Sequence, residues 1–136
     1  MNCSQAVCST YAEDLGLDNV TALRLAAGFG AGMAYTGQTC GAVTGAIMVI
    51  GLKYGKLDDN LPKEAAFARA KETIYAKVQE FERRFCELHG TVRCEELLGY
   101  AISDPAELAK VREAGFFKER CPAFVRDAAA ILEEIL

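Results

Sequence analysis

Cysteine is the residue type that stands out for chemistry, because the 136-residue chain has six cysteines but only one histidine and no tryptophan. Four of them are expected in the first turn of four different helices: Cys3, Cys40, Cys94 and Cys121. The start of a helix carries unpaired N–H groups and a partial positive charge, and both favour ionisation of a thiol. Because the thiolate is the form that binds metals and attacks disulfides, these four side chains are the candidate site residues.

Four thiolates at one site would suit an iron–sulfur cluster with two or four irons, or a zinc ion. Their mutual repulsion would be offset by the helix dipoles and by a bound cation. The long intervals between the four cysteines exclude the Cys-x-x-Cys loops of zinc ribbons and ferredoxins, so spacing alone does not predict a metal site. Thiol–disulfide exchange by two of the four stays open as an alternative, although the chain lacks a resolving pair close in sequence.

The other two cysteines, Cys8 and Cys86, are expected inside helices, where cysteine commonly serves as a small apolar core residue. The single histidine, His89, precedes Gly90 at a predicted helix end, where it complements the helix dipole. With one histidine in the chain, a metal site built from histidines is excluded. We therefore expect Cys8, Cys86 and His89 to lie outside the site.

The elements that must position the cysteines are helices, because the chain has only three prolines and lacks the alternating β-branched runs of strands. Asn2 with Gln5, and Asp104 with Glu107, have the spacing of capping boxes. The expected helices cover residues 2–16, 18–27, 39–55, 62–90, 91–99, 104–115 and 121–136. The sequence therefore predicts an all-α fold, a compact bundle of six to seven helices with one long helix, in a single domain over residues 1–136.

Gly41 and Gly45 lie four residues apart on one face of the expected helix 39–55. A glycine inside a helix costs up to about 1 kcal/mol relative to alanine, so these two positions need a compensating reason. Close approach of another backbone or of a cofactor would supply it, and both glycines are candidate cofactor-binding residues beside Cys40. Tight helix packing alone is the alternative.

Charge and hydropathy narrow the functional classes. The formal net charge is -4, which argues against a nucleic-acid binder, because such a protein shows a basic face. The most apolar stretch, residues 42–52, is shorter than the about 20 residues that a membrane span needs. No targeting segment is visible, so we expect a cytoplasmic protein without membrane insertion. Thiols stay reduced there, which favours metal or redox roles over structural disulfides.

Three segments resemble the family of redox-active proteins named for its C_GCAxxG_C_C signature. They are NCSQAV at residues 2–7, GFGAGM at residues 28–33 and CGAVTGA at residues 40–46, which contains Cys-Gly-Ala-x-x-Gly. The two remaining signature cysteines fall on Cys94 and Cys121. The resemblance covers essentially the whole chain and implies a small all-helical protein with four essential cysteines. It also implies a relation to the iron–sulfur domain of the split-Soret cytochromes.

Residues and resemblance together predict a small redox protein. It would bind an iron–sulfur cluster through Cys3, Cys40, Cys94 and Cys121 and exchange electrons with a partner protein that the sequence does not identify, as a monomer or a homodimer. The alternatives are a thiol–disulfide redox protein that uses one cysteine pair, and an interaction protein with a structural zinc ion. No Ser-His-Asp set, Cys-His pair with a credible base or phosphate loop is visible. We therefore favour an electron carrier or metal-binding protein over a conventional enzyme.

Overall fold

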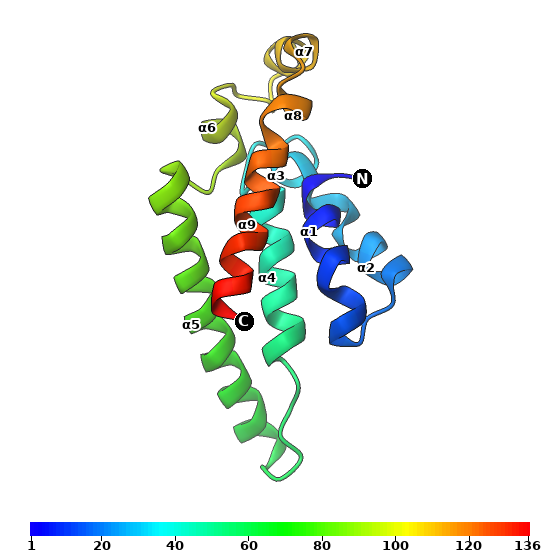
Figure 1. The fold of residues 1–136 in the computed structure, drawn as a ribbon, viewed down its shortest axis with the longest axis vertical. Helices are drawn as coiled ribbons and strands as arrows, with labels where there is room; N and C mark the ends of the chain where they lie inside the picture. The colour runs from blue at the N-terminus through cyan, green and yellow to red at the C-terminus, as the bar shows by residue number, and fades with distance from the viewer.

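A computed structural model describes residues 1–136 as helices joined by short loops, without a β-sheet (Figure 1). The helices are α1 (Cys3–Ala12), α2 (Asn19–Ala26), α3 (Gly30–Ala34), α4 (Gly41–Tyr54), α5 (Lys63–His89), α6 (Cys94–Leu98), α7 (Pro105–Ala114), α8 (Phe116–Glu119) and α9 (Cys121–Ile135). The all-α prediction with one long helix is confirmed, and the seven predicted helices correspond to α1, α2, α4, α5, α6, α7 and α9. None of the helices combines the length and the apolar character that a membrane span requires.

Caps set the predicted helix starts at two places. The capping box at Asn2 is confirmed: the N–H of Gln5 donates to the Asn2 side chain and the N–H of Asn2 donates to the Gln5 side chain, both at 2.9 Å. Asp104 also caps its helix, accepting from the N–H of Ala106 at 3.1 Å. The predicted capping box between Asp104 and Glu107 is wrong, because the Glu107 side chain forms an ion pair with Lys110 instead.

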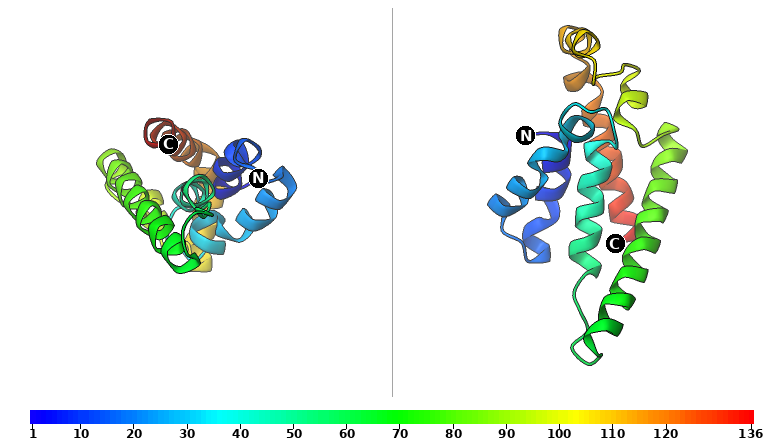
Figure 2. Two further views of the ribbon diagram at one scale, coloured as in Figure 1. Left: turned by 90° about the horizontal axis from the view of Figure 1, so that it is seen from below. Right: turned by 180° about the vertical axis from the view of Figure 1, so that it is seen from behind.

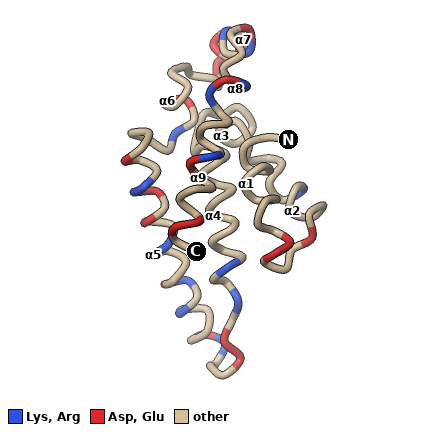
Figure 3. Tube along the Cα trace, viewed as in Figure 1, with Lys and Arg blue, Asp and Glu red and all other residues tan.

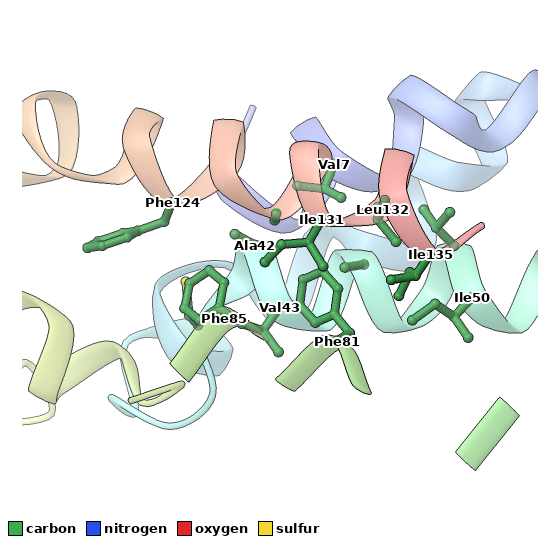
Figure 4. Packing of buried hydrophobic residues seen from close by; sticks show 14 residues of the cluster. Val7, Ala42, Val43, Ile50, Phe81, Phe85, Phe124, Ile131, Leu132 and Ile135 are labelled. Atoms are coloured by element: carbon green, nitrogen blue, oxygen red, sulfur yellow. The ribbon is translucent and has the colours of Figure 1, made fainter. Parts of the chain in front are cut away.

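The central helix α4 has α1 on one side and α5 and α9 on the other (Figures 1 and 2). It is apolar on all faces over most of its length, which is the pattern of a helix buried all round. Phe81 and Phe85 of α5, with Ile131 and Leu132 of α9, form the buried layer that packs against it (Figure 4). This core fixes the axis of α4 and, with it, the position of Cys40 at its N-terminal end.

Helix α1 lies so close to α4 that a side chain would overlap the α1 backbone at one position and would be crowded at a second. A Cβ on Gly41 would lie 3.0 Å from the Ser4 amide nitrogen and 3.1 Å from the Cys3 Cβ. A Cβ on Gly45 would lie 2.7 Å from the Ser4 carbonyl oxygen and 3.1 Å from the Val7 Cβ. The sequence leaves open why a glycine stands inside this helix. At Gly45 the reason is the close approach of the α1 backbone. The same contact places Cys3 beside the start of α4.

We expect Gly45→Ala to lower the free energy of unfolding by about 1–3 kcal/mol, because the new Cβ would overlap the α1 backbone. Gly51→Ala is the matched control in the same helix, since no heavy atom lies within 4 Å of a Cβ placed there. That control should raise stability by up to about 1 kcal/mol through helix propensity alone. Urea denaturation of both variants checks this, and changes of the same sign would contradict the packing argument.

Candidate functional site

The four candidate cysteines line one cavity of about 20 Å³ at the end of the bundle where their helices begin. Cys3, Cys94 and Cys121 are the first residues of α1, α6 and α9, and Cys40 directly precedes α4. The other lining residues are apolar or small: Ala31, Gly41, Leu97, Leu98, Phe117 and Phe124. Because no lining side chain carries oxygen or nitrogen, thiol sulfur is the only side-chain donor at the cavity.

A short antiparallel backbone bridge fixes Cys40 beside Cys94. The Cys40 N–H donates to the carbonyl of Val92 at 2.7 Å, and the Cys94 N–H donates to the carbonyl of Gln38 at 2.6 Å. Both cysteines are almost fully enclosed, with 4% and 6% of their surfaces exposed. The bridge keeps the chain extended up to α6, so the predicted helix start at Thr91 is wrong and the helix begins at Cys94 itself.

Polar side chains beside Cys3 hold the first turn of α1 against the segment that ends α2. Asn2 Nδ2 donates to the carbonyl of Ala27 at 2.9 Å, and Gln5 Nε2 donates to the carbonyl of Leu23 at 2.9 Å. The same two side chains already form the capping box of α1. The cap therefore starts the helix and also anchors Cys3 to a distant part of the chain.

Arg120 anchors the first turn of α9, where Cys121 lies. Its Nη1 donates to the carbonyl of Leu98 at 2.8 Å. Its guanidinium lies 3.8 Å from the centre of the Phe116 ring, within the range of a cation–π interaction. Because Leu98 ends α6 and lines the cavity, this contact joins the helix of Cys121 to the helix of Cys94.

A left-handed turn closes one side of the cavity. All five of its residues have positive φ angles, from 53° to 66°: Ala31, Gly32, Met33, Ala34 and Tyr35. The Tyr35 N–H donates to the carbonyl of Ala31 at 3.1 Å. A left-handed conformation costs a non-glycine residue about 1–2 kcal/mol. A Cβ on Gly32 would lie 2.7 Å from the Cys94 Cβ, so this glycine is required by space as well as by conformation.

The four thiols differ in how readily they ionise. A hydrogen bond with Cys121 lowers the pKa of Cys3 to about 7, although burial opposes the shift. Burial raises the pKa of Cys40 to about 11 and that of Cys94 to about 12. The pKa of Cys121 lies far above its usual range, because Cys121 keeps its proton in the hydrogen bond with Cys3 and because it is buried near the other thiols.

The expectation that helix starts would lower the pKa of all four thiols is therefore wrong for three of them. For Cys40 and Cys94 the main reason is desolvation, since burial in an apolar cavity disfavours the charged thiolate, whereas Cys121 is held protonated first by its hydrogen bond with Cys3 and then by burial. Only Cys3, which also has a hydrogen-bonding neighbour, ionises near neutral pH. A cation in the cavity would reverse this balance.

The donor set fits a thiophilic metal or cluster, since four sulfurs and no competing side-chain donor line the cavity. The sulfurs do not lie at ligand positions: no group of three or more His, Cys, Asp or Glu side chains is arranged to hold a metal ion. A cavity of about 20 Å³ also has room for little more than one water-sized particle. Binding of a cluster would therefore require the cavity wall to move outward.

That wall is thin on one side. Cys3, Ala31, Phe117 and Cys121 line the cavity and also line an open groove of about 610 Å³. The arrangement thus offers space on the side where Cys3 and Cys121 lie.

The remaining cysteines lie elsewhere. Cys8 is buried among alanines of α1 and α2, and burial raises its pKa. Cys86 is a partly buried residue of α5 and does not line the cavity. Of the two candidate glycines, Gly41 lines the cavity, whereas the space at Gly45 is filled by α1.

His89 supports the cavity indirectly. It is the last residue of α5, as predicted, and its Nε2 lies 2.8 Å from Asp127 Oδ2. Its ring also packs edge-on against Phe124, with the ring centres 5.0 Å apart. Because Phe124 lines the cavity, His89 stabilises the wall from behind without facing the thiols.

Comparison with known families matches residues 1–135 to the family described as "Putative redox-active protein (C_GCAxxG_C_C)". The chain belongs to this family. Comparison with curated proteins and with solved structures gave no match. In this C_GCAxxG_C_C protein, the four cysteines that the resemblance assigns to the signature are the four that line the cavity. That they bind a cofactor stays a prediction.

Two anchors of this C_GCAxxG_C_C protein do not follow from its sequence. The capping role of Asn2 was visible from its spacing to Gln5, but its bond to Ala27 depends on tertiary structure. Arg120 gave no local signal, since its partner is a backbone carbonyl 22 residues away. The left-handed turn had a partial signal in its glycines, but alanine and tyrosine at positive φ do not follow from propensity.

Alkylation of Cys3 in the metal-free protein should be half-maximal near pH 7, because its thiolate accepts a hydrogen bond from Cys121. Cys121→Ala removes that donor and should move the midpoint upward, whereas Cys86→Ala should leave it unchanged. Iodoacetamide labelling across pH, read by mass spectrometry of the Cys3 peptide, measures the midpoint. An unmodified protein with a midpoint near the ordinary thiol pKa of about 8.5 would contradict the hydrogen-bonded pair.

Ala34→Gly should raise the free energy of unfolding by up to about 1 kcal/mol, because relief of left-handed strain exceeds the entropy that glycine adds to the unfolded chain. Ala34 is exposed, so the substitution removes no packing. Ala68→Gly on the exposed face of α5 is the control and should lower stability by about 1 kcal/mol. Destabilisation of both variants in thermal unfolding would rule out the strained turn.

Proposed function

We propose that this protein binds an iron–sulfur cluster through Cys3, Cys40, Cys94 and Cys121 and acts as an electron carrier. The observation that carries the proposal is one apolar cavity lined by four cysteines that come from four separate helix starts. A cluster would supply one-electron chemistry at that position. Membership of a family described as redox-active supports the same chemistry.

The residues around the cavity would perform three tasks. Leu97, Leu98 and Phe124 exclude water and keep the local dielectric low, which tunes a redox potential. The backbone bridge holds the main chain of Cys40 beside that of Cys94. The helix starts direct N–H groups toward the negative charge that four thiolates would carry.

Loading should depend on pH. Cysteine must lose its proton to bind a metal, so three thiols with raised pKa values release protons on loading. The affinity for metal should therefore rise with pH through the neutral range. Cys3, with a pKa of about 7, is the thiol best prepared to make the first bond.

Thiol–disulfide exchange is the second candidate, favoured by one observation. Cys3 and Cys121 form a hydrogen-bonded pair in which Cys3 has the lowered pKa of a nucleophile and Cys121 keeps its proton. Both also line the open groove, so a substrate could reach them. Disulfide exchange needs only two of the cysteines, whereas cluster binding needs all four. Zinc binding would also need all four, but the zinc-bound protein would show no redox response.

Anaerobic purification followed by iron and acid-labile sulfide analysis tests the proposal. Iron and sulfide in comparable amounts are expected in the unmodified protein and in Cys86→Ser, the control variant outside the cavity. Cys94→Ser and Cys121→Ser should each lose most of both, with unchanged helical circular dichroism. Zinc without sulfide would establish the structural alternative, and full activity of Cys94→Ser in a disulfide assay would establish the exchange alternative.

A further inference from the structure

The open groove that shares Cys3 and Cys121 with the cavity has the properties of a small-molecule site. Its volume of about 610 Å³ lies within the range of ligand pockets. Most of its lining is apolar, including Ala6 and Val125 on opposing helices α1 and α9. Such a lining binds the apolar body of a ligand, while a few polar groups set its orientation.

Two aromatic rings form part of the wall. Tyr35 and Phe117 lie edge to face, with ring centres 6.1 Å apart. The guanidinium of Arg112 lies 4.9 Å from the centre of the Tyr35 ring and holds that ring in place. Tyr35 ends the left-handed turn, so the strained backbone presents an aromatic side chain to the groove. A planar aromatic ligand can add stacked or edge-to-face contacts with these rings to the burial of its apolar surface, which an aliphatic ligand cannot.

The charges of the groove are all positive. Lys118 and Arg126 line it, and neither takes part in an ion pair. No aspartate or glutamate lines it, although the chain carries a net charge of -4. Helices α1 and α3, which supply Ala6 and Ala31 of the lining, contain no charged residue (Figure 3). An anionic group would find its complement here.

We propose that the groove binds a planar aromatic anion, of which flavin mononucleotide is a suitable probe. The ring system would lie against Tyr35 and Phe117, and the phosphate would lie at Lys118 and Arg126. A ligand seated in this way would be next to Cys3 and Cys121, the two cysteines on the outer side of the cavity. The groove is open in the metal-free protein, so flavin binding does not require that the cavity holds a cluster.

Fluorescence titration of the full chain with two flavins, together with competition by inorganic phosphate and by octanoate, tests the inference. Flavin mononucleotide should bind in a one-to-one, saturable manner. Riboflavin, which lacks the phosphate, should bind at least about tenfold more weakly, because hydrogen bonds to a charged group are lost. Inorganic phosphate alone should compete only weakly. Equal affinity for both flavins would overturn the role of the cations, and competition by octanoate at lower concentration would overturn the aromatic preference.

Charge-removing variants locate the site. Lys118→Gln and Arg126→Gln should each weaken binding of flavin mononucleotide several-fold and leave riboflavin unchanged. Lys53→Gln removes a charge from the far end of α4 and is the matched control. Equal losses in all three variants would overturn the assignment.

A second copy of the chain is the competing occupant. No flavin binding, together with a dimer in sedimentation that dissociates on Val125→Arg, would assign the groove to that copy and overturn the inference. Iron and sulfide are measured separately in the same preparation. Absence of flavin binding can therefore be distinguished from absence of an iron–sulfur cluster.

Discussion

The side-chain-free face of α4 at Gly41 and Gly45 is the constraint on which the site depends. Only glycine lets the α1 backbone approach until a Cβ on Gly45 would lie 2.7 Å from the Ser4 carbonyl oxygen. This approach sets Cys3 beside Cys40, because each residue stands at the start of its helix. The other two cysteines then reach the same place through a backbone bridge and through the first residue of α9, which lines the same cavity.

The cavity balances two opposing electrostatic effects. Helix starts favour thiolates, whereas an apolar lining with no polar side chain disfavours them. In the metal-free protein desolvation keeps Cys40 and Cys94 protonated, the hydrogen bond with Cys3 together with burial keeps Cys121 protonated, and Cys3 alone ionises near neutral pH. A bound cation would shift this balance toward four thiolates. Loading of a metal centre would therefore be coupled to the release of the thiol protons.

Local signals predicted much of this architecture. The spacing of Asn2 and Gln5 predicts a helix start. The four cysteines that the sequence places in the first turn of a helix are the four that line the cavity. Features that depend on distant partners were not predictable: the bridge that delays α6 to Cys94, the bond from Arg120 and the raised thiol pKa values. The left-handed turn was hidden for a different reason, because packing forces alanines into a conformation that they avoid alone.

Iron K-edge X-ray absorption of protein prepared without oxygen tests the central claim most directly, since it reports the atoms around each iron. If the four cysteines of the cavity hold an iron–sulfur cluster, each iron should have only sulfur atoms in its first coordination shell. The spectrum should also show scattering between neighbouring irons. Four cysteines and an absence of other side-chain donors in the cavity leave no source of nitrogen or oxygen ligands from its lining. A first shell dominated by nitrogen or oxygen, or iron without iron neighbours, would contradict the account.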